Sequence, residues 1–265
     1  TDVYSPRTTF RCTRLRGAKV GGSVCQFCAV GCSQLGFFKD GKLIDVEGDP
    51  RSSVNEGRLC PKGSSTYALN ENPYRKVKPM YRAPGSDHWK EVSLDWMLDT
   101  VAKRIWETRN KGFVEKDPKT GITVNNCANI GFIGGSANDN EECYLFRKLF
   151  TGGLGILPVE NSARYCHSTT VCALSPTFGF GACTNPPRDL LNSDCILIMG
   201  SNMAEAHPCA FYWPMQAKKK GTVTIHVDPR YTRTSAACDH HVHIRPETDI
   251  AFLSGICLLS TSDAA

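Results

Sequence analysis

Three cysteines lie within eight residues of one another, and a fourth returns from further along the chain. Their spacing is Cys25-x2-Cys28-x3-Cys32-x27-Cys60. Four thiolates hold a 4Fe–4S cluster, whereas a structural zinc site usually combines two Cys-x2-Cys pairs, and the second pair is missing here. The spacing therefore favours an iron–sulfur cluster. Zinc, or disulfides among the 14 cysteines of the chain, remain open alternatives.

A lysine, Lys62, follows the fourth cysteine by two residues. A positive charge beside a reduced cluster would stabilise the added electron, and the side chain could connect the cluster to a neighbouring redox centre. An ordinary surface lysine is the alternative, and the position in the sequence does not decide between the two.

A second place for chemistry is the adjacent pair Cys166-His167. We expect this pair in a loop ahead of a short helix that begins near Thr169. A cysteine close to a helix N-terminus has a lowered thiol pKa and is a good nucleophile or metal ligand, and a histidine can accept a proton near neutral pH. A structural cysteine beside a surface histidine is the alternative. A hydrolytic pair is disfavoured because nothing marks a third member or an oxyanion hole.

Glycine-rich or polar turns follow three of the predicted strands. Glycine amides in such turns can approach a phosphate closely, and a carboxylate can accept hydrogen bonds from a ribose or a guanine. No complete Gly-x-Gly-x-x-Gly fingerprint is present, and each turn alone fits ordinary turn chemistry equally well. Together the turns favour a nucleotide-bearing cofactor. They are Gly134-Gly135-Ser136, Gly200-Ser201-Asn202 with Glu205 and His207 after it, and Asp228.

The elements that must position these residues fall into two parts, 1–87 and 88–265. In the first part, Lys39-Asp40-Gly41 is a hairpin signal, which predicts a small β module with cysteines on its loops. An arm at 1–24 precedes this module, and a linker at 72–87 that is rich in proline and basic residues follows it.

In the second part, predicted strands alternate with helices, which is typical of a parallel, doubly wound sheet. Ser93 caps a helix that extends to about residue 109. We expect the sheet to be partial, because no further strand follows the helix that opens at Thr248. The other predicted elements are strands at 129–133, 195–199, 222–227 and 242–244, and helices at 140–150 and 207–219.

The composition is that of an ordinary globular chain, with 41% hydrophobic and 22% charged residues over 265 positions. The 31 basic and 26 acidic residues leave a net charge of +5, which is too mild and too scattered for a nucleic-acid binder. The longest apolar stretch, 250–259, is about half the length that a bilayer span requires. Neither a nucleic-acid partner nor a membrane span is therefore expected.

Taken together, these motifs resemble the catalytic subunit of molybdenum- or tungsten-dependent formate dehydrogenases, within the molybdopterin oxidoreductases. The segment 25–62 is similar to the family's 4Fe–4S motif. The segment 163–171 is similar to its metal-ligand loop, in which histidine follows a selenocysteine or cysteine; the related nitrate reductases typically have methionine there. The segment 81–86 resembles respiratory members, and 200–208 and 227–234 resemble the loops that hold molybdopterin guanine dinucleotide.

This resemblance implies oxidation of formate to CO2, or the reverse, with a 4Fe–4S cluster and a bis-molybdopterin guanine dinucleotide that carries Mo or W. Cys166 would ligate the Mo or W, and His167 would take or shuttle the proton. Electrons would leave past Lys62 to the cluster on the four spaced cysteines. The residues implied to bind the cofactor are Lys62, Gly200, Ser201, Asn202, Glu205, His207, Asp228, Arg230 and Asp249.

Three alternatives to this function stay open. One is another molybdopterin oxidoreductase, such as a nitrate reductase. Another is a non-catalytic iron–sulfur module for electron transfer, and the third is a zinc-dependent structural domain. The chain also departs from respiratory members at Phe180, Cys183 and Pro186, where those proteins usually have arginine, methionine and histidine.

The family's second pterin-binding domain and its formate-positioning arginine would lie downstream of these 265 residues. We therefore expect the chain to be inactive alone and to need a second polypeptide or the remainder of its own chain. An iron–sulfur subunit would receive the electrons. The absence of an initiator methionine at Thr1, together with the match to respiratory members, favours the periplasm over the cytoplasm.

Overall fold

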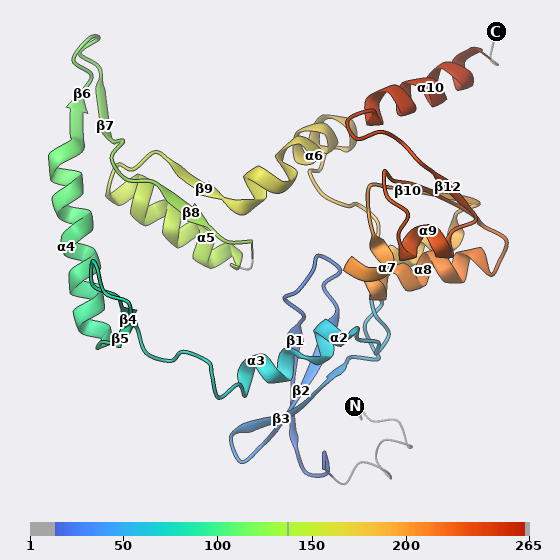
Figure 1. Cartoon of the computed structure of the whole chain (residues 1–265), viewed down its shortest axis with the longest axis horizontal. Helices are drawn as coiled ribbons and strands as arrows, with labels where there is room; N and C mark the ends of the chain where they lie inside the picture. The colour runs from blue at the N-terminus through green and yellow to red at the C-terminus, as the bar shows by residue number, and fades with distance from the viewer. Residues whose placement is uncertain (1–13, 137, 263–265) are drawn as a thin grey trace. The chain divides into compact units, whose positions relative to one another are not determined.

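The computed structural model describes residues 14–136 and 138–262, which form two compact units (Figure 1). Unit 1 combines the chain up to Pro73 with the chain from Asn185 onward, and unit 2 is Tyr74–Thr184. Most of the predicted arm, residues 1–13, lies outside the described residues. The functional division at residue 87 stays a prediction.

Unit 1 begins with a three-stranded antiparallel sheet in the order β1-β2-β3. The strands are β1 (Lys19–Val24), β2 (Ser33–Lys39) and β3 (Lys42–Gly48). The turn between β2 and β3 places Asp40 at φ 51° and Gly41 at φ 77°, the left-handed pair of a tight hairpin turn. The predicted hairpin is therefore confirmed. Its core consists of Leu15, Leu35 and Phe37.

Two short helices follow this sheet, α2 (Pro61–Ser64) and α3 (Thr66–Asn70). They are fastened to β2 by Gln34, whose side chain is buried. Its amide Nε2 donates to the Gly63 carbonyl at 2.8 Å and to Thr66 Oγ1 at 3.2 Å. A buried amide with partners of this kind fixes the position of the helix relative to the sheet.

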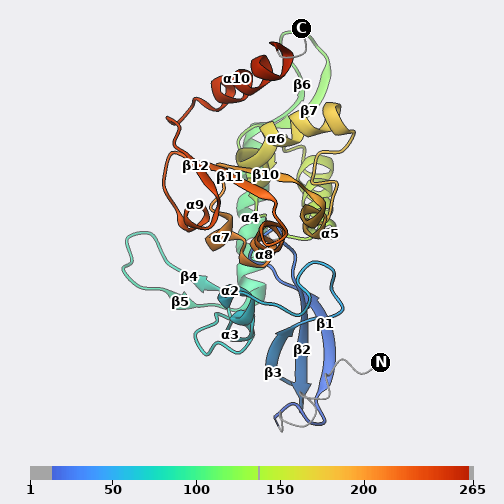
Figure 2. The same cartoon turned by 90° about the vertical axis from the view of Figure 1, so that its right-hand side faces the viewer.

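The remainder of unit 1 is built on a three-stranded parallel sheet in the order β10-β11-β12 (Figure 2). Met199, Val227 and Val242 are register partners at the carboxyl ends of its strands. The core packs Ile196 and Ile198 against Phe211. The elements are a 3₁₀ helix (Pro187–Asn192), β10 (Cys195–Met199), α7 (Met203–Ala206), α8 (Pro208–Lys218), β11 (Val223–Val227), α9 (Arg233–Ala237), β12 (His240–Val242) and α10 (Asp249–Ser262).

Unit 2 combines three small two-stranded sheets with helices. Its predicted first helix is confirmed as α4, and Ser93 Oγ accepts the Trp96 amide at 3.2 Å as the helix N-cap. A capping box at Asp139 and Glu142 opens α5. The elements are β4 (Met80–Tyr81), β5 (Lys90–Glu91), α4 (Leu94–Gly112), β6 (Phe113–Lys116), β7 (Thr123–Cys127), β8 (Phe132–Gly134), α5 (Asn140–Arg147), a π-helical turn (Lys148–Gly153), β9 (Val159–Asn161) and α6 (Ser162–Phe178).

The fold is a mixed α/β arrangement with several small sheets. The expected parallel pairing is present, in β10-β11-β12 of unit 1 and in β8-β9 of unit 2. These strands belong to separate sheets, so the expectation of one doubly wound sheet is met only at the coarser level of fold class. Among the helices of residues 14–136 and 138–262, none has the length and apolar character needed to span a bilayer.

Candidate functional site

The first three spaced cysteines lie on the turn between β1 and β2. The strand pairing ends at Val24 and Ser33, and the Cys25 amide then donates to the Cys32 carbonyl at 2.9 Å, which closes the loop. Inside it, Gly31 has φ 64°, a conformation that residues with a side chain rarely adopt. The hairpin therefore holds Cys25, Cys28 and Cys32 on one tight turn.

The fourth cysteine is brought back by the loop that follows β3. Asn55 is only 1% exposed, and its side chain bonds the backbone in three places. Its Oδ1 accepts the Ser33 amide at 3.0 Å, and its Nδ2 donates to the carbonyls of Ser33 at 3.1 Å and Arg58 at 2.9 Å. A Cβ on Gly48 would lie 2.4 Å from the Gly57 carbonyl oxygen, so the close approach of the two loop ends requires glycine. Cys60 then stands directly before α2.

These four cysteines line one pocket, with Cys209 of α8 as a fifth. Burial raises the pKa of the Cys32 thiol to about 12, and the neighbouring Cys209 adds to the rise. A thiolate is therefore unfavourable in this place unless a cation compensates for it, and bound metal deprotonates a coordinating thiol outright. The donor set is all sulfur, as iron–sulfur clusters require.

The arrangement differs from a site for a single metal ion. Among residues 14–136 and 138–262, no three Cys, His, Asp or Glu side chains converge on one ion position, as a tetrahedral zinc site would require. Four thiolates suit a four-iron cluster, in which each ligand binds a separate iron atom. Cys25, Cys28, Cys32, Cys60 and Cys209 are free thiols.

Within unit 1, α8 connects the cysteine module to the parallel sheet. The Arg58 guanidinium lies 3.8 Å from the centre of the Tyr212 ring and donates to the Tyr212 hydroxyl at 3.0 Å. Trp213 is 2% exposed, and its Nε1 donates to the Val54 carbonyl at 3.0 Å. The loop that carries Cys60 is thus held by side chains of α8.

Lys62 connects the cysteine module to the end of α7. Its ammonium group donates to the carbonyl of Ala206 at 3.0 Å and to that of Glu205 at 3.4 Å. The lysine is half-buried. It joins the helix that follows Cys60 to the turn that follows Gly200-Ser201-Asn202, which is the position that a bridge between the cluster and a cofactor would need.

The predicted cofactor turns of unit 1 are gathered at the carboxyl edge of the parallel sheet. The Gly200 amide donates to the Val227 carbonyl at 2.9 Å, so the turns after β10 and β11 lie side by side. Asn202 accepts a hydrogen bond from Thr234 Oγ1 at 3.0 Å. Asp228 Oδ1 accepts the Arg230 amide at 2.7 Å.

Beside this edge lies an open pocket of about 470 Å³, and Glu205 and Arg230 are among the residues that line it. Glu205 also pairs with Arg233, with 3.3 Å between Oε1 and Nε. The predicted residue Asp249 is not in this group; it is exposed in the first turn of α10. The lining residues are Glu205, Arg230, Tyr231, Thr232, Arg233 and Ala236.

Two histidines support the same edge. His226 is fully buried; its Nδ1 lies 2.8 Å from Ser235 Oγ and its Nε2 lies 3.2 Å from the Ser201 carbonyl oxygen. Since a carbonyl only accepts, Nε2 carries the proton, and the neutral ring spans two of the turns. His207 is the residue before α8, and its Nδ1 is buried with no hydrogen-bond partner in the described part of the chain. An orphaned ring nitrogen of this kind suits a polar group on a bound ligand.

Cys166 and His167 belong to unit 2, and their local structure differs from the expectation. Both lie within the span of α6, which Asn161 caps by accepting the Ala163 amide at 2.9 Å. The helix is broken at His167, with φ −138° and ψ 22°. The expected loop before a helix at Thr169 is therefore wrong: Cys166 ends a first helical turn, and the kink separates it from the remainder of α6.

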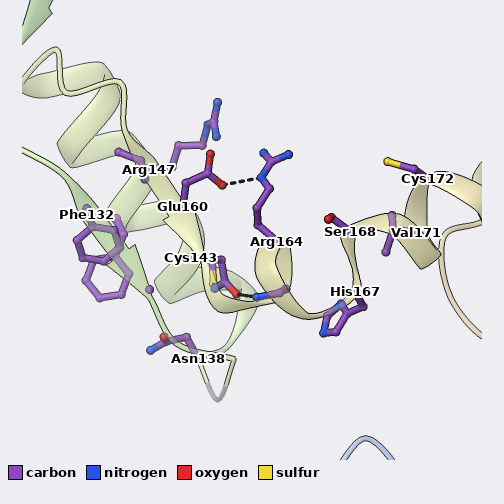
Figure 3. A pocket seen from close by; sticks show the side chains of 15 residues that line it. Phe132, Asn138, Cys143, Arg147, Glu160, Arg164, His167, Ser168, Val171 and Cys172 are labelled. Carbon is purple, nitrogen blue, oxygen red and sulfur yellow. Dashed lines mark hydrogen bonds and ion pairs between the residues drawn. The ribbon is translucent and has the colours of Figure 1, made fainter. Parts of the chain in front are cut away.

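A pocket of about 460 Å³ adjoins this kink (Figure 3). His167 lines it together with Arg164, whose Nε is 2.6 Å from Glu160 Oε2. Asn161 Nδ2 donates to the Gly135 carbonyl at 2.8 Å, so the predicted turn Gly134-Gly135-Ser136 lies next to the start of α6. Cys166 is exposed and is not one of the lining residues.

Several residues of these sites were not singled out from the sequence. Cys209 and His226 come close to the predicted residues only through the packing of α8 and β11, which spacing does not reveal. For Arg233 a signal existed, because it stands in the segment 227–234 that resembles a cofactor loop. Asn161 could have been recognised as the N-cap of a helix that starts earlier than expected.

Two family models cover most of the chain. Residues 75–262 match the model described as molybdopterin oxidoreductase, and residues 18–72 match the molybdopterin oxidoreductase Fe4S4 domain. The second match contains the four spaced cysteines.

The chain is also similar to subunits of formate dehydrogenases. The formate dehydrogenase subunit alpha of Megalodesulfovibrio gigas is 52% identical over 241 residues, which is 90% of this chain and 24% of that protein. The formate dehydrogenase-O major subunit of Escherichia coli is 43% identical over 244 residues, 89% of this chain and 24% of that protein. The chain thus spans about a quarter of the length of these relatives.

Among solved structures, acetylene hydratase from Pelobacter acetylenicus is similar, with a TM-score of 0.61. Its sequence is 20% identical, and the match covers 87% of this chain and 30% of that one. At this level of identity the likeness concerns the fold alone.

Proposed function

The chain belongs to the molybdopterin oxidoreductase family, and on that premise we propose that it is the N-terminal portion of the catalytic subunit of a formate dehydrogenase. The observation that carries the proposal is the identity of 52% to a formate dehydrogenase alpha subunit over 90% of this chain. The reaction is the two-electron oxidation of formate to CO2 or its reverse.

The 4Fe–4S cluster of the proposed enzyme would be held by Cys25, Cys28, Cys32 and Cys60. The support is that these four thiols line one pocket and that the buried Cys32 thiolate needs a compensating cation. Lys62 would lie between this cluster and the cofactor, since its ammonium group bonds the carbonyls at the end of α7. There it would stabilise the negative charge of an added electron.

The bis-molybdopterin guanine dinucleotide would be held in part at the carboxyl edge of β10 and β11. The orphaned Nδ1 of His207 and the open pocket beside Glu205 support this placement. The exposed Arg230 is suited to phosphate by charge. The remaining proposed contacts are Gly200, Ser201, Asn202, Asp228 and Asp249.

Cys166 would provide the protein ligand to the metal, as a cysteine or as a selenocysteine in the natural protein. When bound, the Mo or W centre supplies a two-electron acceptor. Formate loses two electrons and one proton as it becomes CO2, and His167 would take that proton at a ring nitrogen. Both side chains are exposed beside the kink in α6, which is the access that a metal ligand and a proton carrier need.

The remaining expectations form part of the same proposal. In the whole protein the parallel strands would contribute to a doubly wound sheet, with residues 1–87 as the cluster module and linker and 88–265 as the first part of the pterin-binding domains. The partners would be a further polypeptide segment that completes the pterin site and an iron–sulfur subunit that accepts electrons. The proposed location is the periplasm.

The test is metal and activity analysis of the holoprotein purified without oxygen. We expect iron and sulfide, either Mo or W, pterin, and dye reduction that depends on formate. Iron and sulfide without Mo, W or pterin would replace the proposal with a simple electron-transfer module. Zinc without iron would replace it with a structural zinc domain, and reduction of nitrate without oxidation of formate would assign another reaction.

A further inference from the structure

The cluster pocket contains a fifth sulfur that lies outside the cysteine motif. Cys209 is 7% exposed and packs with Cys25 and Cys32 in one buried group. It lines the same pocket as the four proposed ligands. A four-iron cluster takes one thiolate per iron, so this pocket offers one cysteine more than a cluster uses.

The position of Cys209 is fixed by the contacts of α8 with the cysteine module. It stands in the first turn of α8, and the next turn of that helix carries Tyr212 and Trp213, which bond the loop of Arg58 and Val54. The helix therefore cannot move away from the cysteine loop without breaking both contacts. The thiol is held against the pocket by secondary structure.

Two acceptors lie within reach of this thiol. Its Sγ is 3.7 Å from the Arg58 carbonyl oxygen, and its side chain packs with that of Cys32 in the same buried group. A cysteine bound to iron is a thiolate without a proton, so in that state only Cys209 can donate between the two sulfurs. A charged acceptor forms a stronger hydrogen bond than a carbonyl does.

From this arrangement we propose that Cys209 is not a ligand and donates a hydrogen bond to the Cys32 sulfur, which raises the reduction potential of the cluster. The inference rests on the proposed cluster in this pocket. The physical reason is that an electron added to the cluster increases the negative charge on its sulfurs. A donor aimed at a sulfur therefore favours the reduced form, and hydrogen bonds of this kind are known to set cluster potentials.

The test compares two replacements of Cys209 in the holoprotein. Cys209→Val keeps a side chain of similar size without a donor, and Cys209→Ser keeps a donor in a smaller group. The midpoint potential of the cluster is measured by redox titration followed by electron paramagnetic resonance. For Cys209→Val we expect the equilibrium constant for reduction to fall about 3- to 10-fold, and tenfold equals about 59 mV for one electron. For Cys209→Ser we expect a potential at or above that of the wild type.

Cys238→Val is the matched control. Cys238 is a partly buried thiol of the same unit that packs against a different core group, so its replacement should leave the potential unchanged.

Equal potentials for the wild type and Cys209→Val, or equal lowering of the potential in the valine and serine variants, would overturn the inference. If Cys209→Val fails to keep the cluster, Cys209→Ala takes its place in the comparison. Loss of the cluster in all three variants would show that Cys209 is needed to hold the cluster and would also overturn the inference.

These outcomes are separate from those for the proposed function. A wild-type protein without iron and sulfide contradicts the cluster itself. A wild-type protein with a normal cluster, whose potential does not respond to Cys209, contradicts only the role of the fifth thiol.

Discussion

Cys28 is the more accessible member of the turn between β1 and β2, since Cys25 and Cys32 are buried. Its replacement therefore disturbs the apolar surroundings of the pocket least. This makes Cys28 the best position at which to separate loss of a metal ligand from loss of packing.

We predict that Cys28→Ser weakens or abolishes the broad visible absorption of the cluster, because serine is a poor substitute for a soft thiolate ligand. The measurement is the absorption spectrum together with the iron content of the purified holoprotein. Cys195→Ser, at an exposed thiol of β10, is the control and should keep a full spectrum. An unaltered spectrum in Cys28→Ser would refute this ligand.

We predict that Cys166→Ala abolishes formate oxidation and leaves the 4Fe–4S spectrum in place. The reason is that Cys166 would hold the metal at which formate reacts, while the cluster cysteines belong to the other unit. Formate-dependent dye reduction and the cluster spectrum are measured on the same sample. Cys257→Ala, at an exposed thiol of α10, should remain active. Turnover near the wild-type rate in Cys166→Ala would contradict the assignment.

For single site residues, the sequence allowed those of local motifs to be predicted but not those that tertiary packing supplies. The spacing of Cys25, Cys28 and Cys32 reflects one hairpin turn, and such short-range geometry is visible in a sequence. Cys209 lies in the same pocket because α8 packs against the cysteine module, and this packing depends on contacts between segments far apart in the chain.

Among the elements, α8 performs two tasks at once. One part of its surface packs Phe211 into the core of the parallel sheet, and another carries Cys209, Tyr212 and Trp213 toward the cysteine module. A change on this second surface should therefore affect the cluster module while the sheet keeps its own core.

We predict that Trp213→Ala destabilises unit 1 by about 3–5 kcal/mol, because truncating a fully buried tryptophan leaves a cavity and the Val54 carbonyl loses its donor. Denaturant unfolding of the holoprotein, with loss of cluster absorption as the signal, gives the free energy. Trp106→Ala, at a residue 58% exposed on α4, should change it by only about 0.5 kcal/mol. Equal effects of the two replacements would argue against the role of α8.

We also predict a dependence of stability on pH that arises from His226. Burial lowers the pKa of this histidine, so the folded chain keeps it neutral, while the unfolded chain binds a proton below about pH 6.5. The contribution of His226 to the free energy of unfolding should therefore be fully present above this pH and should decline as the pH falls below it. The polar groups that face the ring include Asp228, His241, Ser235 and the Ser201 carbonyl.

The measurement is the thermal midpoint of the wild type and His226→Gln between pH 5 and pH 8. At pH 8 the thermal midpoint of the glutamine variant should be lower than that of the wild type, because glutamine cannot reproduce both ring contacts. Between pH 8 and pH 5 the midpoint of the variant should fall by less than that of the wild type. A decline with falling pH that is as steep in His226→Gln as in the wild type would assign the effect to other groups.

Regular elements were predictable where local signals agree with the final packing. β10 lies where it was expected because Cys195–Met199 is a short apolar run between turn signals. The break in α6 was not predictable, since the residues around His167 carry no proline or glycine that would mark it. Its backbone conformation results from tertiary structure and not from the propensity of the segment.

For the molecule as a whole, the two units differ in how much of their apolar surface is covered. Unit 1 has buried groups in both of its sheets. In unit 2, α4 has no buried residue, and Leu94 and Leu98 are more than half exposed. Exposed apolar residues gathered on one helix are a common mark of a contact surface.

We predict that residues 1–265 expressed alone do not reduce a dye with formate. A cofactor with two guanine dinucleotides is larger than one edge of a sheet can enclose, and burial of the ligand is what holds it. The measurements are pterin content, iron content and formate-dependent dye reduction. A preparation that binds both pterins and turns over formate would overturn this prediction.

The hydrogen bonds of Asn55 have a consequence for how the cluster is assembled in the cell. They tie the chain near Cys60 to the start of β2 through the Asn55 side chain and backbone groups, and none of them involves sulfur. The entropy lost in closing a long loop is therefore already compensated by protein contacts. At the proposed cluster site, iron delivery would then meet ligands that are ordered in advance, so we expect that the module can be loaded, or loaded again after loss of a cluster, without unfolding the chain.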